Sequence, residues 1–121
     1  MSLDAVLARL EDPDEEVRVA ALKALRKLEP ATLALHADAV VAKLEDDDSN
    51  VRRMALYTLA ELEPATLAQH AEAVVARFED SAEMVHVVAV MTLANLEPAT
   101  LAQHADAVVA KLEDDDSNVR R

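Results

Sequence analysis

Four histidines are the residues in this chain with the most recognisable chemistry. His36, His70 and His104 recur at a spacing of 34 residues, and His86 stands outside that series. Neighbouring helices pack about 8–10 Å apart, whereas a metal ion holds its imidazole ligands at about 2 Å. Two of the repeated histidines therefore cannot share an ion, and we expect them to be structural. His86 could titrate near neutral pH, although a surface substitution is the favoured interpretation.

The acidic segment EDDDSN at 45–50 is a second candidate for chemistry. It has the carboxylates of a calcium loop but lacks the glycine at the sixth position and the distal glutamate. We therefore predict no metal site. Most acidic residues lie in such segments, at 11–16, 45–48, 79–83 and 113–116. Helix capping and solubility are the favoured interpretation of this acidic edge, and steering of a basic partner is the alternative.

The composition argues against nucleophilic catalysis and against cofactor binding. The chain has no cysteine and no glycine, which excludes thiol nucleophiles, disulfides and glycine-rich phosphate loops. Its only serines are Ser2, Ser49, Ser81 and Ser117, and no histidine or acid is placed to activate one of them. We expect no cofactor and no enzymatic activity.

The net charge of −12 argues against nucleic acid as a partner, because phosphates demand a basic surface. No apolar run approaches the roughly 20 residues that a membrane span requires, and no signal-peptide pattern opens the chain. We therefore expect a cytoplasmic protein without a membrane partner.

An internal repeat organises the whole chain. The segment at 28–53 returns in altered form at 62–87 and almost unchanged at 96–121, where Gln103 replaces Leu35. This constant offset of 34 residues predicts a repeat protein, in which neighbouring units together bury a continuous core. We predict a single repeat domain over 1–121, with a truncated unit at 1–27, complete units at 28–61 and 62–95, and a truncated unit at 96–121.

Each complete unit is predicted to contain two antiparallel helices. In the second unit, Leu33, Ala37, Val40, Val41 and Leu44 follow the spacing of one helical face. Pro30 and its equivalents suit the first position of a helix, and the acidic turn can cap the next helix. The expected helices lie near 2–12, 14–28, 30–45, 48–62, 64–79, 82–95 and 98–113.

The pattern L-x-D-x-D-x-x-V-R-x-x-A-x-x-x-L-x-x-L occurs twice in full. Its fixed residues are Leu10, Asp12, Asp14, Val17, Arg18, Ala21, Leu25 and Leu28, and then Leu44, Asp46, Asp48, Val51, Arg52, Ala55, Leu59 and Leu62. This pattern resembles the HEAT-repeat family, whereas the Trp and Gly signature of tetratricopeptide repeats, which share the period, is missing. The resemblance implies an all-α fold, a right-handed alpha-alpha superhelix (HEAT-like solenoid) of about 3.5 repeats.

The resemblance also implies a ladder of ion pairs between neighbouring repeats. The matching positions are Asp12, Asp46, Asp80 and Asp114 with Arg18, Arg52 and Arg120. An arginine suits this position because its planar fork can bond a carboxylate and backbone carbonyls together. The third unit departs from the pattern, with His86 in place of the arginine and Ser81-Ala82 in place of two aspartates.

The second and third units differ mainly in their second helices. The variable residues follow i, i+3, i+4, i+7, i+11 spacing, which places them on one stripe away from the core face. The stripe contains Asn50, Arg53, Met54, Tyr57 and Glu61, then Met84, Val87, Val88, Met91 and Asn95, with Glu16, Val19, Ala20, Lys23 and Lys27 in the first unit. The resemblance places second helices on a concave side, so we predict that the stripe binds a partner protein or peptide.

Within this stripe we predict anchors and selectivity residues. The anchors are Tyr57, Met54, Met84, Val87, Val88 and Met91, and selectivity would come from Arg53, Lys23 and Glu61. The apolar part, MVHVVAVM at 84–91, has two interpretations. It could pack within the chain or against the fourth unit, or it could be an exposed patch for a protein partner or a second copy.

The fourth unit ends soon after its first helix. The apolar residues of that helix, Leu101, Ala105, Val108, Val109 and Leu112, would have little to cover them. Leaving several such side chains in water costs a few kcal/mol at about 25 cal/mol per Å². We therefore predict self-association, as a homo-oligomer and most simply a dimer.

The leading prediction is a non-enzymatic protein–protein interaction scaffold. The alternative is a structural self-assembling protein that uses its open ends and apolar stripe. The near-identity of the second and fourth units fits either a recent duplication in a natural protein or a designed consensus sequence.

Overall fold

The computed structural model describes residues 2–94, 96 and 102, and all regular structure in them is helical. The first unit contains α1 (Leu3–Arg9) and α2 (Glu15–Arg26). The second contains α3 (Pro30–Ala34), α4 (Ala37–Ala42), the 3₁₀ turn η1 (Lys43–Glu45) and α5 (Ser49–Leu59). The third contains α6 (Pro64–Ala68), α7 (Ala71–Ala76), η2 (Arg77–Glu79) and α8 (Glu83–Leu93).

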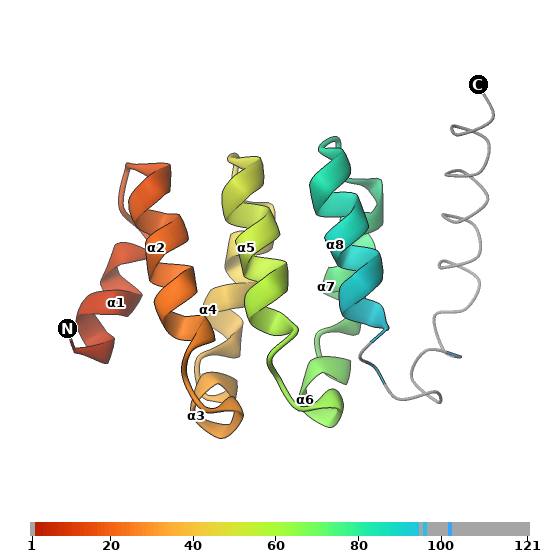
Figure 1. Cartoon of the computed structure of the whole chain (residues 1–121), viewed down its shortest axis with the longest axis horizontal. Coiled ribbons are helices and arrows are strands. Elements are labelled where there is room, and N and C mark those ends of the chain that lie inside the picture. The colour runs from red at the N-terminus through yellow and green to blue at the C-terminus, as the bar shows by residue number, and fades with distance from the viewer. Residues whose placement is uncertain (1, 95, 97–101, 103–121) are drawn as a thin grey trace.

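The helices form two layers (Figure 1). The second helices α2, α5 and α8 stand side by side in one layer, and α1, α4 and α7 lie behind them. Within the front layer, α5 packs against α2 on one side and α8 on the other. Each unit thus contributes one helix to a row, and residues at equivalent positions of α2, α5 and α8 recur across one surface.

The first helix of each complete unit is not the continuous helix predicted over 30–45 or 64–79. The chain leaves the α-helix after Ala34, and His36 takes φ −120° and ψ 15° before Ala37 begins α4. The amide of His36 bonds the carbonyl of Leu33, three residues back, at 2.9 Å. The break recurs at His70 (φ −115°, ψ 14°), so it belongs to the repeat. The break has no proline or glycine, and the apolar residues keep helical spacing across it. The sequence therefore contains no sign that the helix is interrupted there.

Local sequence explains most helix starts. Pro30 and Pro64 are the first residues of α3 and α6. The N–H group that proline lacks would have no acceptor within the helix at this position, so the helix loses no hydrogen bond. Asp48 caps α5 through hydrogen bonds to the amides of Asn50 and Val51. At the equivalent position before α8, Ala82 makes no such bond with its side chain.

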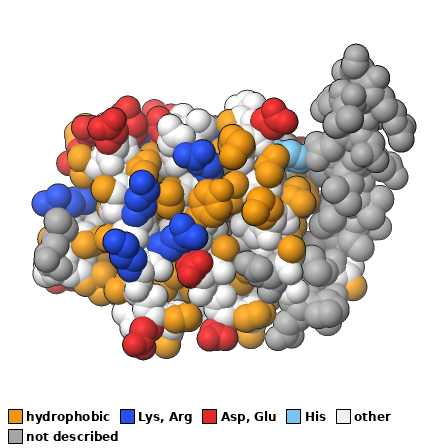
Figure 2. All heavy atoms as spheres, in the orientation of Figure 1, with side chains coloured by type: hydrophobic (Ala, Val, Ile, Leu, Met, Phe, Trp, Pro, Cys, Tyr) orange, Lys and Arg blue, Asp and Glu red, His pale blue; other side chains and the backbone are white. Residues whose placement is uncertain are grey.

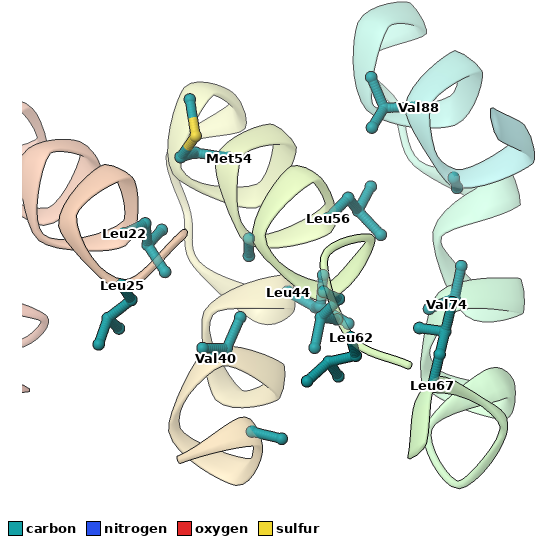
Figure 3. Close-up of a cluster of buried hydrophobic side chains, with 14 of the residues drawn as sticks. Leu22, Leu25, Val40, Leu44, Met54, Leu56, Leu62, Leu67, Val74 and Val88 are labelled. Atoms are coloured by element: carbon teal, nitrogen blue, oxygen red, sulfur yellow. The ribbon is translucent and has the colours of Figure 1, made fainter. Parts of the chain in front are cut away.

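A continuous hydrophobic core, mostly aliphatic, runs between the layers (Figure 3). Three fixed residues of the repeat pattern on α5, namely Val51, Ala55 and Leu59, are buried. The first helices supply Leu33, Val40 and Leu44 in the second unit, and their equivalents Leu67, Val74 and Phe78 in the third. Val41, predicted on the same face, is only half-buried. Equivalent side chains thus fill the core from unit to unit.

Among the helices of the described residues, none is both long and apolar enough to cross a membrane.

Candidate binding surface

An ion pair fixes the first unit to the second at the end where the second helices begin. Arg18 on α2 contacts Asp46, with Nε 3.0 Å from Oδ2 and Nη2 3.1 Å from Oδ1. Its Nη1 donates to the carbonyls of Asp12 (2.7 Å) and Pro13 (3.0 Å). Asp46 also accepts the amide of Asp48 at 3.0 Å. One guanidinium therefore joins two units and two backbone carbonyls.

The same arrangement joins the second unit to the third. Arg52 donates from Nε (2.7 Å) and Nη2 (2.9 Å) to the carboxylate of Asp80, and from Nη1 to the carbonyl of Asp46 (2.8 Å). Arg77 adds a weaker contact to Asp80 at 3.5 Å. The ladder implied by the resemblance is thus present at both described junctions, and it aligns α2, α5 and α8 in one register.

The ladder changes the acidity of its carboxyl groups. Burial raises the pKa of Asp80, but the Arg52 guanidinium and the Ala82 amide lower it more, and the net result is a lowered pKa. Burial likewise raises the pKa of Asp46, but hydrogen bonds from the Asp48 amide and from Arg18 lower it more, so the net result is again a lowered pKa. Both aspartates therefore remain ionised at neutral pH.

His86 occupies the ladder position of the third unit. Its Nδ1 lies 2.7 Å from the carbonyl oxygen of Phe78, and its ring meets the Phe78 ring edge-on with centroids 6.1 Å apart. The next ladder residues, Asp114 and Arg120, lie outside the described residues. The third junction therefore remains a prediction.

The variable stripe of α8 contains an exposed apolar patch. Met84, Val87 and Met91 are 51%, 39% and 57% exposed, respectively. Figure 2 shows apolar side chains gathered on this part of the front surface, next to Lys and Arg side chains over α2 and α5. Within the described part of the chain, these three side chains agree with the interpretation of the MVHVVAVM segment as an exposed patch, not with the one in which it packs inside the chain.

Two predicted anchors are not on the surface. Met54 is 8% exposed and Val88 only 1%, so placing them among the exposed anchors was wrong. Both side chains lie where one second helix packs against the preceding one. Their equivalent in the first unit, Ala20, is exposed because no second helix precedes α2 among the described residues. Helical spacing identified the correct stripe, but it did not show that one edge of the stripe meets the neighbouring helix.

Tyr57 is half-buried because a residue of the first unit covers its ring. The guanidinium carbon of Arg26 lies 5.3 Å from the ring centroid, and Nε of Arg26 is 3.7 Å from a carboxylate oxygen of Glu61. Arg26 was missed at the sequence level, since both complete units carry alanine there (Ala60 and Ala94). Comparison with the first unit could have revealed it.

Arg53 and Lys23 line a shallow depression between α2 and α5. Its volume is about 390 Å³, and its walls are Glu15, Glu16, Val19, Ala20, Lys23, Asn50 and Arg53. Nε of Arg53 is buried and has no hydrogen-bond partner in the described part of the chain. The structure therefore brings Lys23, Asn50 and Arg53 together as a donor cluster beside the apolar patch.

Several predicted residues cannot be placed. Asn95 of the stripe lies outside the described residues, as do Leu101, Ala105, Val108, Val109 and Leu112, on which the predicted self-association depends. The homo-oligomer accordingly remains a prediction.

Hollows along the acidic edge recur between neighbouring turns. One of about 520 Å³ is lined by residues including Glu11, Asp12, Asp46 and Asp48, and one of about 410 Å³ by residues including Asp46, Glu79 and Asp80. Their innermost carboxylates belong to the ladder. Among the described residues, no group of three or more histidine, aspartate or glutamate side chains is arranged to hold a metal ion.

A model of HEAT repeats matches residues 3–81, which include nearly all of the first two units and the third unit as far as the turn before α8. No curated protein matches the chain. The helix that carries the apolar patch thus follows directly after the matched region.

Proposed function

The chain belongs to the HEAT-repeat family, and from this premise we propose that it is a non-enzymatic scaffold whose second-helix layer binds a protein or peptide. HEAT repeats commonly serve as protein-interaction scaffolds. We define the docking face as Met84, Val87 and Met91 of α8 together with Arg53 and Tyr57 of α5 and Lys23 of α2. These side chains occupy stripe positions of three neighbouring helices, and such a row can contact one partner continuously.

The observation that carries this proposal is the exposed apolar patch of α8. Asn50, Arg53 and Tyr57 stand at the three equivalent positions of α5, so the framework accepts polar or amphipathic residues there. Exposed methionine and valine contribute nothing to solubility, and helix propensity does not favour valine. Clustered exposed apolar side chains rimmed by polar ones are typical of protein-interaction sites, and flexible methionines adapt to varied partners.

The mechanism is preorganisation. The ladder and the continuous core hold α2, α5 and α8 in fixed register before a partner arrives. Little backbone ordering then opposes binding, and the affinity depends on a few anchor side chains.

The second unit supplies the residues for a test. The graft variant Met84→Asn, Val87→Arg, Met91→Tyr gives α8 the residues that α5 carries at the equivalent positions. A matched control is Leu35→Gln, which removes another exposed apolar side chain (80% exposed) and installs the residue of the third and fourth units. A displayed peptide library is panned on immobilised wild-type chain, and the enriched peptides are tested on both variants.

We expect the enriched peptides to lose binding to the graft variant and to keep it for Leu35→Gln. Equal binding to the graft variant, with its helicity intact by circular dichroism, would rule out the α8 patch as the docking surface. Self-assembly is the competing outcome: the wild-type chain would then sediment as an oligomer, the graft variant as a monomer, and no peptide would be enriched.

A further inference from the structure

The charge on the docking face differs from that of the whole molecule. The chain carries a net charge of −12, and its carboxylates gather at the turns. On the front surface, Lys and Arg side chains lie together over α2 and α5 (Figure 2). Among the described residues, Lys23 and Arg53 form no ion pair with a carboxylate. Two cations without an ion pair in the described part of the chain therefore lie beside the apolar patch.

Arg53 in particular lacks an acceptor. Its Nε is buried without a hydrogen bond in the described part of the chain, and a buried donor without a partner costs free energy. The depression beside it is lined by the donors Lys23, Asn50 and Arg53, while Glu15 and Glu16, from the first turn of α2, line the rest. A carboxylate entering the depression would face Lys23 and could accept charge-assisted hydrogen bonds, which are stronger than neutral ones, from the terminal nitrogens of the Arg53 guanidinium.

We propose that the docking face selects an acidic, amphipathic peptide segment, with apolar side chains on Met84, Val87 and Met91 of α8 and a carboxylate between Arg53 and Lys23. This inference rests on the proposed function and specifies the chemistry of the partner. The apolar patch supplies contact area, and the cation pair sets the sign of charge that the partner must carry beside it. Glu15 and Glu16 of the first acidic turn line the same depression, so the carboxylate of the partner would lie on its Arg53 side, away from them. Repulsion from the other acidic turns is weakened because mobile ions screen charges beyond about 8 Å at physiological ionic strength.

Two pools of short fluorescent peptides provide the probe. Both pools share the same apolar positions, filled with leucine, methionine or phenylalanine. The polar positions hold aspartate or glutamate in one pool and lysine or arginine in the other. Retention of each pool on the immobilised chain is measured at physiological ionic strength, for wild type and for Lys23→Glu/Arg53→Glu. We expect wild type to retain the acidic pool about tenfold more than the basic pool, and the double variant to invert that preference, because like charges at an interface exclude wrong partners.

Two single variants protect the test against misfolding of the double variant. Arg53→Val installs the residue that Val19 and Val87 carry at the equivalent positions, so it removes the charge with a side chain the repeat accepts. Lys23 is exposed, and Lys23→Glu leaves the core untouched. Arg53→Val, which removes one of the two cations, should reduce the preference for the acidic pool roughly threefold, half of the tenfold preference on a logarithmic scale. Lys23→Glu, which reverses one charge, should reduce it about tenfold, half of the change expected for the double variant.

The outcomes separate this inference from the function on which it rests. If the graft variant abolishes retention but charge reversal leaves the preference unchanged, the docking face stands and the acidic partner is wrong. A preference of wild type for the basic pool would also overturn the inference and indicate the acidic edge instead. If retention of both pools is unaffected by the graft variant, the docking face itself is wrong. If the immobilised chain retains neither peptide pool but does retain fluorescently labelled copies of the same chain, the occupant of the docking face is a second copy.

Discussion

Val87 and Val88 are adjacent in the sequence but differ in their surroundings. Val87 is 39% exposed on the docking face, whereas Val88 is 1% exposed between α8 and α5. Helical periodicity placed both on the variable stripe. It could not show which edge of the stripe is covered, because that depends on how the next helix packs.

Lysine substitutions test this boundary residue by residue. We expect Val88→Lys to destabilise the chain by about 4 kcal/mol or more, because it buries an unpaired ammonium group. Val87→Lys should change the free energy of unfolding by roughly 0.5 kcal/mol at most. Urea unfolding followed by circular dichroism gives both values. A mild effect of Val88→Lys would contradict the packing of α8 on α5.

Asp80 and Asp12 stand at the same position of different units, but only Asp80 accepts an arginine from a preceding unit among the described residues. Asp80→Asn should cost about 2–3 kcal/mol at pH 7, since it leaves Arg52 without its carboxylate. Asp12→Asn keeps an oxygen acceptor for the Asp14 amide and should cost less than about 1 kcal/mol. Similar losses in both variants would show that the ladder contributes little.

The pH dependence of this loss has a defined sign. The pKa of Asp80 is lowered in the folded state, so the unfolded chain binds the proton more tightly. The contribution is complete above the unfolded value of about 3.9 and is lost as the pH falls through the lower folded value. The stability difference between wild type and Asp80→Asn should therefore be constant from pH 7 to about pH 5 and shrink below about pH 4. Urea titrations at a series of pH values measure it, and a difference that persists undiminished at the lowest pH would contradict the assignment.

At the scale of the element, α8 is the helix that departs most from the repeat. Its N-cap residue, Ala82, provides no side-chain cap, whereas Asp14 before α2 and Asp48 before α5 both provide one. Its stripe is apolar, and its ladder position holds His86. The helix that carries the exposed apolar patch thus also lacks the side-chain cap that α2 and α5 have.

Reciprocal substitutions test the cap. Ala82→Asp should stabilise the chain by about 1 kcal/mol, and Asp48→Ala should destabilise it by a similar amount. The midpoint of thermal unfolding should move by roughly 3–6 °C in opposite directions. If Ala82→Asp lowers the midpoint, repulsion from neighbouring carboxylates outweighs the cap at this site.

The sequence predicted the elements unevenly, and the reasons are physical. Periodicity located the core faces and the order of the helices, because burial of apolar side chains follows helical spacing. The ladder was implied by the family resemblance. The breaks at His36 and His70 escaped prediction, since Leu33, Ala37, Val40 and Leu44 keep helical spacing across the first of them. Arg26 over Tyr57 escaped because it depends on a contact between units.

At the scale of the whole molecule, the fold repeats while the surface does not. The core recurs from unit to unit and the ladder recurs at both described junctions, and together they place α2, α5 and α8 in one row. Differences between units gather on the exposed side of that row. A repeat framework of this kind separates stability from recognition, so residues of the docking face can change without loss of the fold.

We propose that this row binds a partner through Met84, Val87 and Met91. The most direct test is the affinity of a peptide selected on wild type, measured by fluorescence anisotropy against wild type, the graft variant and Leu35→Gln. Loss of about 2 kcal/mol of anchor contacts predicts binding roughly 30-fold weaker to the graft variant. Binding to Leu35→Gln should stay within about twofold of wild type. Equal affinity for wild type and the graft variant, or a loss confined to Leu35→Gln, would show that these three residues do not form the binding surface.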